Sequence, residues 1–451
     1  MLSALQISVR QVVRGHAIKA TAIAGLLGQV VRPLVSLLTL PLLLSHLGKD
    51  GLGVWMIALS LMGLIGFVSG GLSASVVTTI GRASADASGQ SVRQLATAAT
   101  VIAVAWGIVV AAIAVPAALA INWEQLLKLD EANSGRDVGS LMAALAGMLA
   151  VSLVAVVPRQ IMIGRMHGYI AHMLDFTGVL ASAVGLIIAL VCDAPLWLLG
   201  LSFLAPGSTV QLLGGLLYLR RARIPLFSKS NVDKQTLRLL GKDSLGMAGY
   251  QSAYAVSSQS DLLLIGIILG APASAVYGVA QRVFALPVLA SGTVNYAQWP
   301  AMARADAKGE ANSLGRMFRW TLFIGTALAS TVALAAAVFY QPLTQLWLGR
   351  DLETDPLILV GMVAWVLVAT LVNTCDSLLR SRLETGLLTR AMMVMAVINI
   401  VTTLTLLPLI GAAGAIWGSV TGYTVALLVP YSIRLWPVIA GRWVEKARGV
   451  A

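Results

Sequence analysis

Long apolar stretches recur through this chain of 451 residues and constrain its fold more than any other feature. A helix needs about 20 apolar residues to cross a bilayer, and stretches of that size occur about twelve times. Hydrophobic residues make up 58% of the chain and charged residues only 11%, less than half of the charged share of soluble proteins. We therefore predict an all-α polytopic membrane protein, which excludes a soluble enzyme, a disordered chain and a coiled coil.

The apolar stretches predict about twelve transmembrane helices. The first begins near Ala17 and is too long for the apolar core of a cleaved signal peptide, so we expect it to remain as the first span. The predicted spans are 17–46, 52–80, 95–120, 138–160, 169–191, 196–219, 244–269, 274–299, 319–341, 357–378, 390–409 and 412–433.

Basic residues predict the orientation of these spans. If the N-terminus is cytoplasmic, 25 lysine and arginine residues lie in or beside cytoplasmic segments, and only Lys49, Lys128, Arg136 and Arg350 lie on the other side. The positive-inside rule then places both termini in the cytoplasm, and we expect a multi-pass protein of a bacterial inner membrane. The net charge of +12 lies mostly in short loops beside spans, which argues against nucleic acid as a partner.

The longest predicted cytoplasmic loop, 220–243, divides the chain into two lobes of six helices. We expect an N-terminal segment 1–16, an N-lobe 17–219, a C-lobe 244–433 and a cytoplasmic tail 434–451. A shift of 222 positions matches Leu47-Gly48 with Leu269-Gly270 and Val54-Trp55 with Val276-Tyr277. Equal numbers of spans in each half predict parallel lobes related by a pseudo-two-fold axis along the membrane normal.

The same shift matches two stripes of polar residues inside spans. Gln29, Arg32, Ser36 and Thr39 fall on Gln251, Tyr254, Ser258 and Asp261, and this spacing covers an arc of about 80° on a helix. Polar side chains are poor neighbours for lipid, so the stripes indicate a wet cavity, although hydrogen bonds between helices explain part of the pattern equally well. The predicted substrate-binding residues of this cavity are Gln29, Arg32, Gln251, Tyr254, Ser258 and Arg282.

Ionisable side chains inside spans are few, and each costs about 2.5 to 3.5 kcal/mol on insertion scales. Arg32 precedes Pro33, and its planar guanidinium suits the phosphate oxygens of an anionic ligand. The alternative is a structural arginine paired with helix carbonyls or with a carboxylate. Asp261 and Arg282 should lie at similar depth on neighbouring antiparallel helices, which predicts an ion pair that either is permanent or opens during transport.

Asp175 and Asp376 lie near the predicted cytoplasmic ends of their spans, and together with Asp261 they are candidates for ion pairing or proton coupling. Asp376 precedes Arg380 by one turn, so pairing between them is the simpler reading. The glycines at 70 and 71 fit helix packing better than a phosphate loop. No P-loop, HExxH, GxSxG or paired-cysteine motif occurs, so we expect no enzyme activity, cofactor or metal.

A family resemblance rests on the first two spans. The segment from Pro41 to Trp55, followed by 58–63 and Gly71-Leu72, resembles the first two helices of bacterial polysaccharide flippases. These belong to the MOP superfamily, which includes the multidrug MATE transporters and the lipid II flippases. In the second half, 261–265, Leu269-Gly270, Tyr277 and 280–282 resemble the seventh and eighth helices of that family.

The resemblance implies a flippase that moves an undecaprenyl-pyrophosphate-linked oligosaccharide from the cytoplasmic to the periplasmic leaflet by alternating access, for O-antigen or exopolysaccharide assembly. It implies an anionic polyprenyl-linked glycan, the bilayer and a polysaccharide polymerase complex as partners, and a monomer. Many relatives have an acidic residue where this chain has Ser69. The alternatives are a cation-coupled multidrug exporter, and less strongly a lipid II flippase, whose relatives usually have additional spans.

Overall fold

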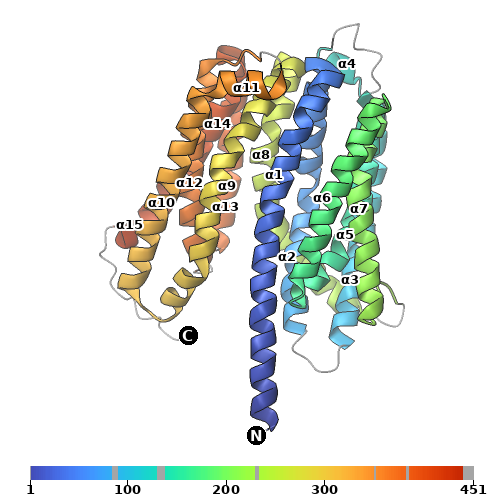
Figure 1. Cartoon of the computed structure of the whole chain (residues 1–451), viewed down its shortest axis with the longest axis vertical. Coiled ribbons are helices and arrows are strands. Elements are labelled where there is room, and N and C mark those ends of the chain that lie inside the picture. The colour runs from blue at the N-terminus through green and yellow to red at the C-terminus, as the bar shows by residue number, and fades with distance from the viewer. Residues whose placement is uncertain are drawn as a thin grey trace. The chain divides into compact units, whose positions relative to one another are not determined.

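The computed structural model describes residues 2–83, 90–129, 138–228, 233–349, 352–381 and 385–439. Within these ranges the chain is helical and contains no strand. Figure 1 labels the α-helices, which are α1 (Leu2–Ile65), α2 (Phe67–Ala83), α3 (Gln90–Ala120), α4 (Trp123–Leu126), α5 (Val138–Gly164), α6 (Gly168–Val191), α7 (Leu196–Arg221), α8 (Lys234–Leu269), α9 (Ala271–Ala307), α10 (Ala311–Val338), α11 (Tyr340–Leu348), α12 (Pro356–Ser381), α13 (Thr385–Ile410), α14 (Ala413–Gly422) and α15 (Val429–Ile439). The π-helical segment η3 (Tyr423–Leu428) joins α14 to α15.

Eleven helical stretches in the described ranges are long and apolar enough to cross a membrane. This confirms the all-α membrane fold. The count differs from about twelve because the stretch Val31–Ile65 combines parts of the first two predicted spans. Helix α1 continues past a break at Gly48, and the rest of the second predicted span is the 17-residue helix α2. The predicted tail beyond 439 and the loop residues 229–232 lie outside the described residues.

The two glycines matched by the internal repeat both have a positive φ angle. Gly48 has φ of 70° and Gly270 has φ of 99°, a region that residues with a Cβ rarely enter. Each glycine ends one long helical segment and starts the next. Trp55 and Tyr277, which the repeat also matches, are both buried. The turn between the first two spans therefore does recur in the second half.

Contacts divide the chain into two compact units. Unit 1 comprises Met1–Gly48 and Ala58–Ser252, and unit 2 comprises Lys49–Ile57 and Ala253–Ala451. The division falls inside α8, between Ser252 and Ala253, and the short stretch after the Gly48 turn packs with the second unit. The residue boundaries of these contact units differ from those of the predicted lobes 17–219 and 244–433. The lobe boundaries remain a prediction from the sequence.

Unit 1 has a core made by α2, α3, α5, α7 and the first half of α8. Val76, Ile80, Ala99 and Ile161 lie in this core and are essentially inaccessible. The backbones of α2 and α8 approach closely at Gly71, where an added Cβ would lie 2.4 Å from the Ser244 carbonyl oxygen. Next to this point the Ser75 and Ser244 hydroxyls are 2.7 Å apart. Close packing thus explains the glycines of α2, as the sequence predicted.

Unit 2 is built on contacts of α9 with α10 and α12, and of α13 with α14. Its largest buried side chains are aromatic, and Phe284 stacks on Tyr340 with ring centroids 6.4 Å apart. The stretch 49–57 packs tightly here, because a Cβ on Gly53 would lie 1.9 Å from the Ala271 carbonyl oxygen. Since Gly53 and Ala271 each follow one of the two matched turns, both turns contribute to the same core.

Candidate functional site

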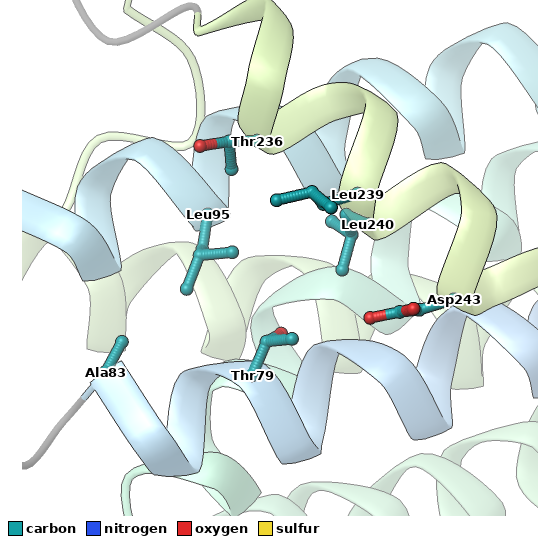
Figure 2. A pocket seen from close by; sticks show the side chains of 7 residues that line it. All are labelled: Thr79, Ala83, Leu95, Thr236, Leu239, Leu240 and Asp243. Atoms are coloured by element: carbon teal, nitrogen blue, oxygen red, sulfur yellow. The ribbon is translucent and has the colours of Figure 1, made fainter.

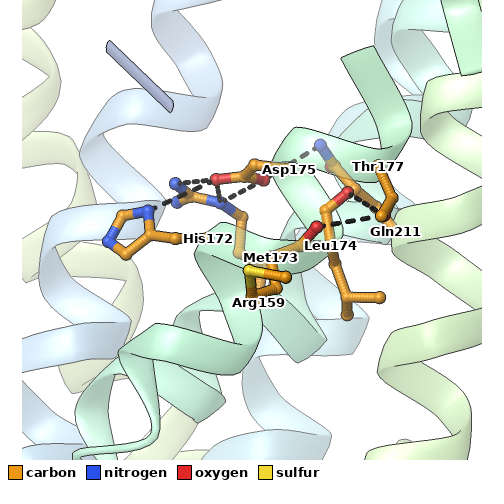
Figure 3. A network of polar contacts seen from close by, with 7 residues as sticks. All are labelled: Arg159, His172, Met173, Leu174, Asp175, Thr177 and Gln211. Carbon is orange, nitrogen blue, oxygen red and sulfur yellow. Dashed lines mark hydrogen bonds and ion pairs between the residues drawn. The ribbon is translucent and has the colours of Figure 1, made fainter. Parts of the chain in front are cut away.

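A network of polar side chains joins three spanning helices inside unit 1, as Figure 3 shows. Asp175 of α6 is 8% exposed. Arg159 of α5 donates to it from Nε, 3.0 Å from each carboxylate oxygen, and from Nη2, 2.7 Å from Oδ2. Gln211 of α7 donates from Nε2 to Oδ1 at 3.1 Å, and His172 Nδ1 lies 3.7 Å from Oδ2. The carboxylate therefore holds α5, α6 and α7 together at one depth.

Arg32 of α1 belongs to the same electrostatic environment. Its charge acts on the Asp175 carboxylate, and its own side chain is exposed. Among the described residues, Arg32 makes no hydrogen bond and no close ion pair, whereas Arg159 is fully engaged with Asp175. Two guanidinium groups and one carboxylate leave one positive charge on this cluster when His172 is neutral. The uncompensated charge is on Arg32, the residue that is accessible.

The segment of α1 that leads to Arg32 packs against α6. A Cβ on Gly25 would lie 3.4 Å from His172 Nε2, and a Cβ on Gly168 would lie 2.6 Å from Thr21 Cγ2. Pro33, the residue after Arg32, lies inside α1. Because proline has no N–H group, the backbone carbonyl four residues before Pro33 receives no helical hydrogen bond. These contacts place α1 against α6 beside His172.

The remaining cavity candidates divide between the two units. Gln29 lies in α1, but its side chain is outside the described part of the structure. Gln251 is in unit 1, and its Cγ lies 3.1 Å from a Cβ built on Gly70 of α2. Tyr254 and Ser258 are in unit 2; Tyr254 is 47% exposed, and the Ser258 hydroxyl donates to the Ala255 carbonyl of its own helix at 3.4 Å. The role of these residues as a cavity lining stays a prediction.

A second polar cluster lies buried in unit 2 around Asp261 of α8. Tyr277 of α9 and Ser419 of α14 both donate hydroxyl hydrogen bonds to Asp261 Oδ2, at 2.9 Å and 3.1 Å. Asn399 of α13 donates from Nδ2 to the Ser419 oxygen at 2.8 Å. All four side chains are at most 4% exposed, whereas Asp261 Oδ1 and Asn399 Oδ1 have no hydrogen-bond partner among the described residues. A carboxylate with one free oxygen in this setting can take up a proton or another cation there.

The predicted ion pair between Asp261 and Arg282 was wrong. Asp261 bonds to Tyr277 and Ser419 instead, and the Arg282 guanidinium donates to the Met56 sulfur from Nε at 3.4 Å and from Nη2 at 3.3 Å. Similar depth on neighbouring helices does not by itself bring two side chains together, because each also points in a particular direction around its helix. Tyr277 and Arg282 are five residues apart on α9, which turns their side chains about 140° from each other, and only Tyr277 points to Asp261.

The predicted pair of Asp376 and Arg380 is confirmed. Arg380 Nε donates to Asp376 Oδ2 one turn away on α12, while Asp376 Oδ1 is buried and has no hydrogen-bond partner within the described ranges. Both charges act on the nearby Tyr254 hydroxyl, so one end of the α8 stripe lies close to this pair. All three residues are in unit 2.

A cavity of about 390 Å³ lies within unit 1, away from these clusters. Thr79 and Ala83 line it from α2, Leu95 from α3, and Thr236, Leu239, Leu240 and Asp243 from α8. Figure 2 shows mostly apolar side chains around it, with the Asp243 carboxylate at one end. None of the predicted site residues lines this cavity, so we do not assign the substrate to it.

Five residues of these clusters were not among the predicted site residues: Arg159, Gln211, Tyr277, Ser419 and Asn399. A signal existed for the first of these: Arg159 and Asp175 lie at nearly equal distances from Met166–His167, the turn between α5 and α6. Equal distance from a turn between antiparallel helices implies equal depth. The other four are uncharged residues. The internal repeat singles out Tyr277, but nothing in the local sequence of Gln211, Ser419 and Asn399 distinguishes them from helix-packing side chains.

Known proteins resemble this chain in sequence family and in fold. The profile of the polysaccharide biosynthesis protein family matches residues 18–306. No curated protein matches the chain. Among solved structures, an inward-facing multidrug resistance MATE transporter of the MOP superfamily has a TM-score of 0.74 at 13% identity, covering 92% of this chain and 98% of that one. A MOP superfamily transporter from Pyrococcus furiosus has a TM-score of 0.66 at 14% identity, covering 94% and 96%.

Helices of membrane-spanning length and a fold shared with those structures define a multi-pass membrane protein with the fold of MOP superfamily transporters. The family match covers more than half of the chain. The chain therefore belongs to the polysaccharide biosynthesis protein family, as its resemblance to polysaccharide flippases predicted.

Proposed function

We propose that this protein is a flippase for an undecaprenyl-pyrophosphate-linked oligosaccharide, moving it from the cytoplasmic to the periplasmic leaflet of a bacterial inner membrane by alternating access. Family membership supports a role in polysaccharide biosynthesis. The observation that carries the substrate assignment is the accessible, uncompensated charge of Arg32 beside the Arg159–Asp175 pair. We also propose that the flipped glycan is used for O-antigen or exopolysaccharide assembly and that a polysaccharide polymerase complex is a partner.

The charge balance of unit 1 favours an anionic ligand. A charged side chain within a span is costly unless it finds a partner or water. The charge of Arg159 is already compensated by Asp175. Arg32 is therefore the group whose positive charge a ligand can neutralise. A guanidinium binds phosphate oxygens in pairs, with charge-assisted hydrogen bonds that are stronger than neutral ones. A pyrophosphate group offers such oxygens, whereas a cationic drug would be repelled.

The Asp175 network fixes the site in place. Because α5, α6 and α7 all bond to one carboxylate, and α1 packs on α6 at Gly25 and Gly168, the position of Arg32 depends on this network. His172 lies between α1 and Asp175 and relays any change in the carboxylate to α1. The network is therefore a positioning element for Arg32.

Energy coupling is assigned to Asp261 in this proposal. Its free Oδ1 is a place where a proton or another cation binds, and its occupied Oδ2 links α8, α9 and α14 through Tyr277 and Ser419. Loading of Oδ1 changes the charge of a buried group held by three helices, so it shifts their packing. The outward movement of an anionic substrate is also favoured by an inside-negative membrane potential, by about 2.3 kcal/mol per charge per 100 mV.

Binding to the purified protein tests the substrate assignment. Undecaprenyl pyrophosphate is titrated into detergent-solubilised wild type and Arg32→Gln, with Arg93→Gln as the control for loss of one exposed cytoplasmic charge. We expect Arg32→Gln to weaken binding about tenfold or more, because a charge-assisted bidentate contact is lost, and Arg93→Gln to have little effect. Equal affinity in all three proteins would contradict the assignment. Binding of cationic dyes in preference to the polyprenyl lipid would favour the multidrug exporter.

A further inference from the structure

A second cavity, of about 270 Å³, lies against an exposed face of α10 in unit 2. It is lined by Arg316, Arg319, Trp320 and Phe323. All four side chains are exposed, Trp320 to 58% and Phe323 to 69%. The span itself runs from Asn312 to Val338, so the cavity lies at the end of a spanning helix. Neither the charge network of unit 1 nor the Asp261 cluster includes any of these residues.

The four residues share one face of α10. Their spacing of 0, 3, 4 and 7 positions places them within an arc of about 100° around the helix. From Arg316 to Phe323 the helix rises about 10 Å, so the two guanidinium groups lie nearer the helix end and the aromatic rings deeper. The Trp320 and Phe323 rings pack edge to face with centroids 6.5 Å apart. The cavity is therefore charged at its shallow end and apolar at its deep end.

The two arginines are not used by the protein in the same way. Arg319 donates from Nη1 to the Val438 carbonyl at the end of α15, at 3.2 Å, which fixes its guanidinium. Arg316 makes no hydrogen bond or ion pair with any described residue. No carboxylate is among the described residues that line the cavity, so both positive charges remain available to an external anion.

This arrangement matches the chemistry of a lipid headgroup at a membrane surface. The polar headgroup region is about 5 to 7 Å thick on each side of the hydrocarbon core. This thickness is comparable to the distance along α10 between the two arginines and the two aromatic rings. Aromatic side chains are favoured at this level, and basic pockets on the cytoplasmic side of spanning helices bind anionic headgroups. The positive-inside rule predicts that α10 begins on that side.

We propose that Arg316, Arg319, Trp320 and Phe323 form a binding site for an anionic phospholipid of the cytoplasmic leaflet. The guanidinium groups hold the phosphate, and the two rings pack along the start of an acyl chain. The occupant is a membrane lipid rather than the transported substrate, because the site lies on an exposed face of one helix of unit 2 and its lining residues offer arginines and rings but no neutral polar groups for sugars.

Native mass spectrometry of the detergent-solubilised full chain, titrated with cardiolipin or with phosphatidylethanolamine, tests this site. We expect wild type to retain cardiolipin more tightly than phosphatidylethanolamine. Arg316→Gln with Arg319→Gln should weaken cardiolipin binding by about 25-fold, taking about fivefold for each basic residue near a membrane surface. Arg220→Gln with Arg221→Gln is the matched control, since it removes two exposed charges at the end of α7, outside this cavity.

A second variant separates lipid binding from general charge and from misfolding. Trp320→Leu with Phe323→Leu keeps every charge, and we expect a several-fold loss of cardiolipin with a normal gel-filtration profile. An equal loss in the Arg316/Arg319 and Arg220/Arg221 double variants would overturn the proposal, because it would show charge attraction without a site. Equal retention of the two lipids by wild type would also overturn it.

Discussion

Arg159 and Asp175 form a two-pronged ion pair between α5 and α6, with Arg159 Nη2 2.7 Å from Asp175 Oδ2 and Nε 3.0 Å from Oδ1. The side chains are 27% and 11% exposed, so the pair is largely removed from solvent. Removing one partner from such a pair leaves the other charge buried and uncompensated, which costs far more than the pair itself contributes.

Replacing Asp175 by Asn should therefore destabilise the protein. We expect a loss of about 3 kcal/mol in unfolding free energy, seen as a lower Tm in a thermal melt of the detergent-solubilised protein. The double variant Arg159→Gln with Asp175→Asn should recover a substantial part of this loss, because no charge is left unpaired. A Tm for Asp175→Asn equal to that of wild type would show that the pair is solvated and that the network does not hold the three helices.

Gly53→Ala tests the close packing of the two matched turns. A methyl group at this position would lie 1.9 Å from the Ala271 carbonyl oxygen, and backbone atoms cannot move aside as a side chain can. We expect a loss of about 3 kcal/mol in stability, the upper end of the usual range for overpacking, measured as lower yield and lower Tm. Gly147→Ala is the matched control, because a Cβ there meets nothing within 4 Å; it should be neutral or slightly stabilising. Comparable melting of the two variants would contradict the packing.

Asp261→Asn should uncouple transport without unfolding unit 2. The amide has the shape of the carboxylate and still accepts hydrogen bonds from Tyr277 and Ser419 at one oxygen, so Tm should change little. Gradient-driven transport should fall about tenfold or more, because the buried group no longer changes charge. Asp193→Asn, at a residue whose side chain is 88% exposed, is the control. Full gradient dependence in Asp261→Asn would assign coupling to another residue.

Acid should destabilise the N-terminal end of α8 by protonating Asp233. Asp233 accepts hydrogen bonds from the backbone N–H groups of Gln235 and Thr236 and from the Thr236 hydroxyl, and these bonds lower the pKa of its carboxyl below the ordinary value. A lowered pKa in the folded state stabilises the helix start above the ordinary pKa, and this contribution is lost as the pH falls through the lowered value.

Hydrogen exchange at the amides of Gln235 and Thr236 measures this effect. At neutral pH these amides should exchange more slowly in wild type than in Asp233→Ala, after correction for intrinsic rates. The difference should vanish once the pH falls below the lowered pKa, where the carboxyl is protonated. A difference that persists undiminished in strong acid would contradict a role for the charged cap.

Much of the fold follows from the sequence because bilayer thickness imposes a length on every apolar stretch. The spans 138–160, 169–191 and 196–219 fall inside α5, α6 and α7. The matched turns at Gly48 and Gly270 were visible because only glycine readily adopts their positive φ. By contrast, the ten residues with which α8 begins before 244, and the short helices α4 and α11, carry no long apolar run, and periodicity in apolar residues does not predict them.

The candidate site was less predictable, because a site depends on direction around a helix as well as depth along it. Counting residues from a turn gives depth, and this count would have paired Arg159 with Asp175 correctly. The same count paired Asp261 with Arg282 wrongly, since Tyr277 faces Asp261 and Arg282 faces Met56. Azimuth is fixed by the packing of several helices together, and no local pattern around Asn399 or Ser419 indicates it.

Flipping of a pyrophosphate-linked glycan should depend on Arg32. Wild type and Arg32→Gln are reconstituted in liposomes with a lipid-linked oligosaccharide in one leaflet, and a membrane-impermeant glycosidase on the other side reports its arrival. We predict transfer that requires the protein and falls at least about tenfold in Arg32→Gln at equal protein incorporation. No transfer by wild type, together with gradient-driven uptake of a cationic dye, would contradict the flippase assignment, and undiminished transfer by Arg32→Gln would contradict the role of Arg32.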